Sequence, residues 1–128
     1  MNIKQLYTSC LSEATYYISS KGEAAIIDPL RETNPYLNLL KSDKSCLKYI
    51  FLTHFHADFV SGHVDLAEAT GAKIICGPTA TADFDFHQGR DGENFKLGNL
   101  EIKLIHTPGH TLESICLSLF DKSNKEHC

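Results

Sequence analysis

Long hydrophobic runs are absent from this sequence of 128 residues. Its apolar stretches, such as residues 24–27, fall far short of the ~20 residues that a membrane-spanning helix needs, so we expect no membrane segment. Glycine and proline are also scarce, at 8 and 4 residues, whereas disordered and collagen-like chains contain roughly 25% or more of the two. With 42% hydrophobic and 22% charged residues, the composition is typical of one globular domain, which we place at residues 1–128.

Basic residues are too few and too dispersed to bind a nucleic acid. Lysine and arginine number 12 against 16 acidic residues, for a net charge of −4, and no basic cluster offsets this balance, so we expect no nucleic-acid partner. The five cysteines form no C-x-x-C pair, and the first ten residues contain no apolar segment of a secretory signal. We therefore expect reduced thiols and a cytoplasmic location.

Local patterns predict strands along most of the chain and two helices. Residues 13–20 alternate between two faces, as a strand does, and the Gly-Asn pair at 98–99 predicts a hairpin turn. The Asn-Pro pair at 34–35 is typical of a helix start, and Gly71 is suited to end a second helix. The expected strands are 13–20, 23–28, 47–53, 72–76, 93–97, 100–107 and 114–120, the expected helices are 35–42 and 61–71, and residues 77–92 are expected to form a loop. Because two helices cannot cover so many strands on both faces, we predict an α+β fold with a mostly antiparallel sheet.

Two histidine groups follow strand ends and carry the chemistry of the chain. The first contains His54, His56 and Asp58, and the second ends in His110 after a Pro-Gly turn. Side chains at positions i and i+2 of an extended backbone project to the same side, so His54 and His56 can meet one ion. Imidazole and carboxylate donors together suit zinc, iron or manganese.

The other histidines have simpler interpretations. We expect His63 near a helix N-terminus without a metal role, and His87 and His127 in solvent. We expect His106, which precedes the Pro-Gly turn, to support that turn through a hydrogen bond rather than to bind a metal. The zinc-finger, H-E-x-x-H, G-x-S-x-G and P-loop patterns are all absent from the sequence.

Three segments resemble the metallo-β-lactamase fold superfamily. Residues 53–59, Thr-His-Phe-His-Ala-Asp-Phe, resemble its H-x-H-x-D-H metal motif, and residues 106–111, His-Thr-Pro-Gly-His-Thr, resemble its second metal-binding turn. Residues 25–29 resemble the strand whose aspartate, here Asp28, supports the metal loop. The pattern H-x-H-A-D-F-x-S-G from His54 to Gly62 is most similar to persulfide dioxygenases of the bacterial subgroup fused to rhodanese domains. Glyoxalase II is the next nearest branch.

The resemblance covers essentially the whole chain and implies the N-terminal half of an αββα sandwich. It implies one mononuclear metal site, with Fe(II) favoured and Zn(II) as the alternative. The implied substrate is a small thiol persulfide of the glutathione type, oxidised to sulfite. The implied metal ligands are His54, His110 and, as a third ligand or a close neighbour, His56; the implied catalytic or orienting residue is Asp58, and the supporting residues are Asp28, Asp58 and His106.

Two departures from the family pattern leave three interpretations open. Phe59 stands where the motif has its last histidine, and a phenyl ring cannot bind a metal, which favours one ion over two. The family also has a later aspartate ligand, and this sequence ends at Cys128 before the corresponding strand. The chain is therefore interpreted as a persulfide dioxygenase-like protein that is inactive if truncated, as a zinc-dependent thioester hydrolase of the glyoxalase II type, or as a truncated metal-binding remnant without catalysis.

A half sandwich would leave an apolar sheet face open. The side chains expected on that face are Leu100, Ile102, Leu104, Ile115, Leu117 and Leu119. Large exposed apolar patches are rare in soluble monomers, so we expect a homodimer or a higher oligomer held by this face. Edge-to-edge pairing of the strand at 114–120 with its copy is a second route to the same assembly.

Overall fold

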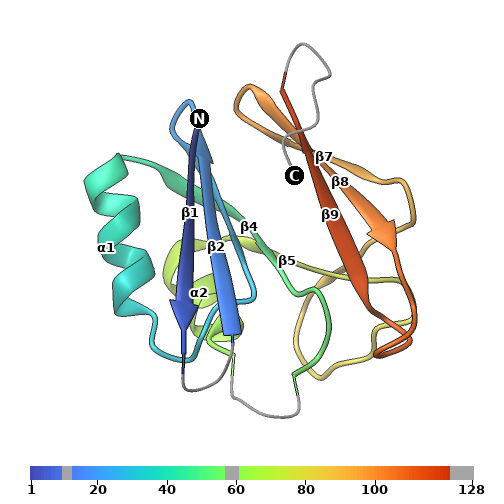
Figure 1. Cartoon of the computed structure of the whole chain (residues 1–128). Helices are drawn as coiled ribbons and strands as arrows, with labels where there is room; N and C mark the ends of the chain where they lie inside the picture. Colours follow the sequence, from blue (N-terminus) through green and yellow to red (C-terminus); the bar gives the residue numbers. More distant parts are fainter. Residues whose placement is uncertain (10–12, 57–60, 122–128) are drawn as a thin grey trace.

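The computed structural model describes residues 1–9, 13–56 and 61–121. Within these ranges the strands form two sheets, and two helices lie against one face of the larger sheet (Figure 1). The predictions for Asp58, Phe59 and His127 concern residues outside the described ranges.

The larger sheet has six strands that lie in chain order. They are β1 (Asn2–Thr8), β2 (Glu13–Ser20), β3 (Glu23–Ile27), β4 (Cys46–Phe51), β5 (Lys73–Cys76) and β6 (His87–Gln88). Pairing is antiparallel from β1 to β3 and parallel from β3 to β6. The α+β class is confirmed, but this parallel half of the sheet was not expected. It arises because α1 follows β3, α2 follows β4 and the non-helical residues 77–86 follow β5, and each connection returns the chain to the same end of the sheet.

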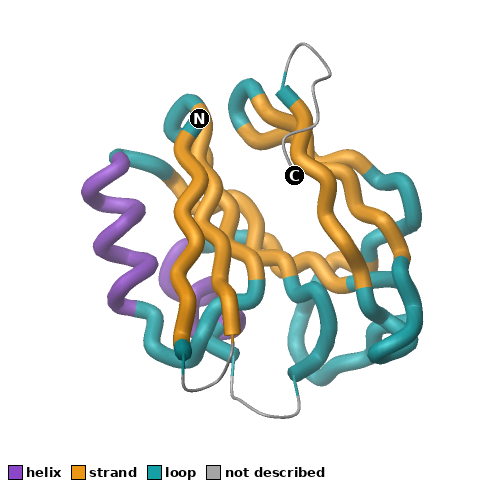
Figure 2. The backbone as a smooth tube through the Cα atoms, viewed as in Figure 1, coloured by secondary structure: helices purple, strands orange, loops and turns teal. Residues whose placement is uncertain are grey.

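Both helices begin and end within two residues of the predicted bounds. Helix α1 (Asn34–Asp43) has proline in its first turn, and α2 (His63–Thr70) ends at Gly71, which has a φ of 73°. Position 62, directly before α2, requires glycine, because a Cβ atom there would lie 2.4 Å from the carbonyl oxygen of Leu30. Figure 2 shows both helices on the same side of the larger sheet.

The helix-covered face of the sheet holds the first of two apolar cores. Tyr17 and Ile26 from the sheet, Tyr36 and Leu40 from α1, and Leu66 from α2 are all buried in it. Neither helix is long or apolar enough to cross a bilayer, and the same is true of every helical segment in the described ranges.

The opposite face of the larger sheet is covered by a second, three-stranded sheet. Its antiparallel strands are β7 (Asn94–Leu97), β8 (Leu100–His106) and β9 (Ile115–Phe120). A second core fills the space between the sheets, where Phe51 makes an edge-on contact with Phe95 at a centroid distance of 5.3 Å. The expected α and β layers are therefore followed by part of a second β layer.

This arrangement overturns the expectation of an open apolar face on β8 and β9. Five of the six side chains assigned to that face are buried between the two sheets: Leu100, Ile102, Leu104, Ile115 and Leu119. The larger sheet covers them, so these five side chains are not exposed for contact with a second copy. Leu117 alone is partly exposed and lines a groove of about 520 Å³ between the two sheets, beside Ile3, Tyr16 and Ile18.

The structure also contains two strands that the sequence did not indicate. Strand β1 pairs with β2 along its whole length, but its side chains lack the alternation that marks a strand. Strand β6 lies within the expected loop at 77–92 and has only two residues, His87 and Gln88. The remaining strands agree with the prediction to within a residue or two at each end.

Candidate metal centre

The structure brings His54, His56 and His110 together. His54 and His56 lie directly after β4, with their ring centroids 4.0 Å apart. His110 lies in the loop between β8 and β9, and its ring centroid is 4.9 Å from that of His54. The side chain of His56 is only 4% exposed, whereas His110 is exposed. Three imidazoles from two distant segments thus meet at the end of β4.

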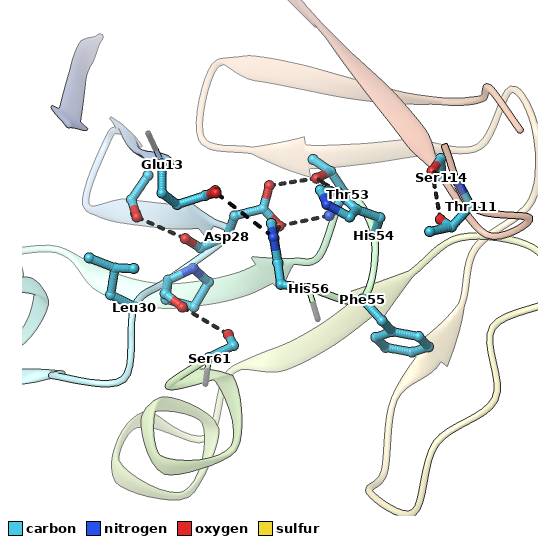
Figure 3. Close-up of polar contacts among 12 residues, drawn as sticks. Glu13, Asp28, Leu30, Thr53, His54, Phe55, His56, Ser61, Thr111 and Ser114 are labelled. Atoms are coloured by element: carbon cyan, nitrogen blue, oxygen red, sulfur yellow. Dashed lines mark hydrogen bonds and ion pairs between the residues drawn. The ribbon is translucent and has the colours of Figure 1, made fainter. Parts of the chain in front are cut away.

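A chain of hydrogen bonds connects Asp28 to His54 through Thr53 (Figure 3). Asp28 has a φ of 50°, a left-handed conformation that aspartate tolerates better than most residues. Its carboxylate accepts hydrogen bonds from the Thr53 amide, at 2.8 Å, and from the Thr53 hydroxyl, at 2.6 Å. The same hydroxyl oxygen lies 3.0 Å from Nδ1 of His54.

This chain of contacts determines which nitrogen of His54 is free to bind a metal. The Thr53 hydroxyl has one proton, which it donates to Asp28, so its oxygen accepts the Nδ1 proton of His54. The lone pair of His54 then lies on Nε2. Metal-binding histidines usually have their other ring nitrogen held in this way, so the arrangement fits a metal ligand.

The electrostatic environment keeps His54 neutral. Burial lowers the pKa of His54, and the neighbouring imidazoles of His56 and His110 lower it further, although the carboxylates of Asp28 and Glu113 oppose them. A metal binds the neutral form of imidazole. His54 is therefore in the protonation state that metal binding requires.

His56 lies between two carboxylates. Its Nε2 is 3.4 Å from Oδ1 of Asp28, and its Nδ1 is 3.8 Å from Oε2 of Glu13. The donor atoms of Glu13, Asp28 and His56 all lie within 4.8 Å of one another, and among the described residues these three form the group close enough to hold a cation. His56 therefore lies beside His54 and between the two carboxylates.

His106 supports the second histidine loop, as the sequence suggested. Its ring Nε2 donates a hydrogen bond to the carbonyl of Leu112 at 2.8 Å, and its backbone amide donates to Asp91 at 2.8 Å. Within the loop, the amide of Thr111 donates to the Ser114 hydroxyl at 3.1 Å. The turn that carries His110 is thus held mainly by contacts within its own segment.

Two further histidines lie apart from this network of contacts. His63 starts α2, and its ring packs against Phe84 at a centroid distance of 4.5 Å. Burial lowers its pKa. His87 is partly exposed, but it also makes a 2.8 Å contact with a carboxylate oxygen of Glu93, so it is not simply a solvated side chain.

Three residues of this site were missed from the sequence: Glu13, Thr53 and Glu113. Thr53 directly precedes the first motif, and this adjacency was the one available signal. Glu113 follows His110 by three residues, and its carboxylate accepts a hydrogen bond from the amide of Phe55 at 3.0 Å. No sequence pattern marks Glu13, because only the pairing of β2 with β3 brings it toward Asp28 and His56.

Known proteins share this sequence pattern and this fold. The sequence profile described as "Metallo-beta-lactamase superfamily" matches residues 9–123. A hydroxyacylglutathione hydrolase of Pelagibacter ubique (strain HTCC1062) is 34% identical over 122 residues, which cover 90% of this chain and 50% of that protein. The chain thus spans about half the length of this curated relative.

Two solved structures are similar to nearly the whole chain. A metallo-beta-lactamase from Staphylococcus aureus subsp. aureus COL has a TM-score of 0.88 and 33% identity, covering 99% of this chain and 40% of the other. The structure of ETHE1 from Myxococcus xanthus has a TM-score of 0.85 and 33% identity, covering 93% of this chain and 54% of the other.

Proposed function

Because this chain belongs to the metallo-beta-lactamase superfamily, we propose that it carries the histidine-rich part of a mononuclear iron site for persulfide oxidation. The substrate is a thiol persulfide of the glutathione type, which O₂ and one water molecule convert to sulfite and free thiol. The observation that carries this proposal is the meeting of His54 and His110, with Nε2 of His54 left free by the contact between Thr53 and Nδ1. Similarity to ETHE1 and the H-x-H-A-D-F-x-S-G pattern support this branch of the family.

In this proposal each site residue has a separate role. His54 and His110 bind the metal, with His56 as third ligand or neighbour, and Asp58 acts near the reacting atoms or orients a histidine or a water. Asp28 orients His54 through Thr53, and His106 holds the turn of His110. A bound Fe(II) ion supplies the one-electron chemistry with O₂ that persulfide oxidation needs. The phenyl ring of Phe59 in the place of a histidine favours one ion.

The second candidate function is zinc-dependent hydrolysis of a glutathione thioester. It is favoured by the 34% identity to a hydroxyacylglutathione hydrolase. Zinc would act there by lowering the pKa of a bound water. The cluster of Glu13, Asp28 and His56 offers the oxygen and nitrogen donors that a second ion would use.

The third candidate is a metal-binding protein without catalysis. The chain spans 50% of the curated relative and 40% and 54% of the two solved structures described above. In this candidate, turnover would need the later aspartate ligand of the family, which lies in the part of the relatives that this chain does not match. Metal binding and catalysis are therefore separate parts of the proposal.

Metal analysis followed by two activity assays tests these candidates. We expect about one iron per chain after anaerobic loading, and oxygen uptake with glutathione persulfide. Zinc near two per chain, with hydrolysis of a hydroxyacyl thioester of glutathione, would favour the second function. Metal binding with neither activity would favour the third.

Self-association and location complete the proposal. Strand β9 lies at the edge of the smaller sheet among the described strands, so pairing of two copies along this edge remains a proposed route to a homodimer. Light scattering would show twice the mass of 14.3 kDa if this is correct.

The described cysteines Cys46, Cys76 and Cys116 are free thiols, and we propose a cytoplasmic location, where thiols stay reduced.

A further inference from the structure

The end of the loop between β8 and β9, together with the first residue of β9, contacts the first histidine loop at two backbone positions. The amide of Ile115 donates a hydrogen bond to the carbonyl of Thr53 at 2.8 Å. The carboxylate of Glu113 accepts a hydrogen bond from the amide of Phe55 at 3.0 Å. These two contacts lie immediately before and immediately after His54 in the sequence, so the second loop holds the backbone of His54 on both sides.

Glu113 is held firmly in this position. Burial alone would raise its pKa, but hydrogen bonds from the Phe55 amide, its own amide and the Thr111 hydroxyl, together with the nearby imidazole of His54, outweigh burial and lower the pKa of Glu113. The carboxylate is therefore ionised at neutral pH, and charge-assisted hydrogen bonds are the stronger kind. The chain behind it also packs closely, because a Cβ atom on Gly77 would lie 2.0 Å from the Glu113 carbonyl oxygen.

Phe55 is fixed on its other side by the first core. Its ring packs edge-on against Phe84 at a centroid distance of 6.5 Å and contacts the first core cluster. Its amide, by contrast, points toward the second loop and finds its acceptor on Glu113. Phe55 thus connects the core under α2 to the loop that carries His110.

We infer that Glu113 is a positioning residue that sets the orientation of His54 relative to His110. Glu113 and His110 lie three residues apart in one loop, so holding Phe55 also fixes the neighbouring His54 against His110. This inference rests on the proposal that these two histidines bind one metal. It assigns Glu113 no contact with the metal or with a substrate.

The experiment compares Glu113→Ala with Glu113→Gln in the full chain. Alanine removes the acceptor, whereas the amide oxygen of glutamine can still accept the Phe55 hydrogen bond. Glu68→Ala is the matched control, because Glu68 is an exposed acidic residue on α2. The metal-free readout is the amide proton shift of Phe55 in an NMR spectrum, and the metal readouts are the affinity for Co(II) and the Co(II) absorption spectrum.

We expect Glu113→Ala to move the Phe55 amide signal and to weaken Co(II) binding by about 10–100-fold, the usual cost of losing a supporting partner. Glu68→Ala should leave both readouts close to those of the unaltered chain. Glu113→Gln keeps an acceptor but loses the charge that strengthens the hydrogen bond and acts on His54, so it should change each readout less than Glu113→Ala does. An altered Co(II) spectrum in Glu113→Ala would show changed ligand geometry, which a purely stabilising contact would not cause. If Glu113→Ala does not fold, Glu113→Leu keeps the side-chain volume without an acceptor and is measured in its place.

Three results would overturn this inference. They are an unmoved Phe55 amide signal in Glu113→Ala, unchanged Co(II) affinity and spectrum in that variant, and an equal loss in Glu113→Gln, which would show that the charge matters rather than the hydrogen bond. Failure of the unaltered chain to bind Co(II) would instead contradict the proposed function. The Phe55 signal would still report on the contact itself in that case.

Discussion

The two histidine loops differ in how the rest of the chain supports them. In the first loop, Glu13 of β2 and Asp28 at the end of β3 lie against the histidines, and the side chain of His56 is almost fully buried. In the second loop, His110 is exposed, and its turn is held mainly by neighbours in its own segment. The difference indicates that β2 and β3 support the first loop from one side, while Glu113 and Ile115 connect it to the segment that carries His110.

Removing a histidine from either loop should have the largest effect. We expect His54→Ala and His110→Ala each to abolish tight metal binding, by more than the roughly 10–100-fold that loss of a supporting partner causes. His87→Ala and His127→Ala serve as controls, and should retain the metal. Metal content after dialysis measures the effect, and unchanged content in His110→Ala would show that the second loop takes no part in the site.

Thr53→Val should produce the next largest effect, confined to the first loop. Valine matches threonine in shape but removes the hydroxyl between Asp28 and His54. We expect metal affinity to fall about 10–100-fold and the free energy of unfolding to fall by about 1–3 kcal/mol, because Asp28 loses a buried donor. Thr53→Ser keeps the hydroxyl and should behave like the unaltered chain in both measurements; if it does not, the methyl group of Thr53 matters instead.

The pH dependence of stability tests the region under the first loop. Phe84 contacts both Phe55 and His63, and burial lowers the pKa of His63 in the folded chain. The unfolded chain then binds more protons than the folded chain as the pH falls below about 6.5, the ordinary pKa of histidine. We expect the free energy of unfolding to be unaffected by His63 above that pH and to fall progressively below it, because the folded chain holds His63 neutral while the unfolded chain protonates it.

His63→Phe should reduce this loss, because phenylalanine does not titrate and still packs against Phe84. The midpoint of urea unfolding at several pH values between about 5 and 8, the range in which histidine titrates, measures the difference. An identical pH profile in the variant would mean that His63 is not the group responsible.

His106→Ala should have the smallest effect, in the second loop. It removes the bond from the ring to the carbonyl of Leu112, which lies at the surface and is worth about 0.5–1.5 kcal/mol at most. We expect a metal affinity a few-fold lower and little change in thermal stability. A loss as large as that of Thr53→Val would contradict the view that the second loop depends less on side-chain support.

Much of this molecule could be predicted from local sequence patterns. Alternation and turn residues indicated the hairpin of β7 and β8, and Gly71 marked the end of α2. These features depend on neighbours in the sequence, where steric and hydrogen-bond rules act directly. The histidines at 54, 56 and 110 stood out for the same reason, since each follows a recognisable strand end.

Features that depend on distant partners could not be predicted. The parallel pairing of β3 to β6 follows from the path of the two helices and of residues 77–86 rather than from any strand pattern. The burial of Ile102 and the other apolar side chains of β8 against the larger sheet was not predicted. An alternating strand has the same sequence pattern whether the sheet that packs on it belongs to this chain or to another. Glu113 and Glu13 have no sequence signal, because packing alone brings their carboxylates to Phe55 and His56.

The most direct test of the central claim is a crystal structure of the metal-loaded chain with an anomalous-scattering map. The account predicts a single metal peak in contact with Nε2 of His54 and with the imidazole of His110. Two peaks a few ångströms apart, or one peak bound by Glu13, Asp28 and His56 without His54, would contradict it.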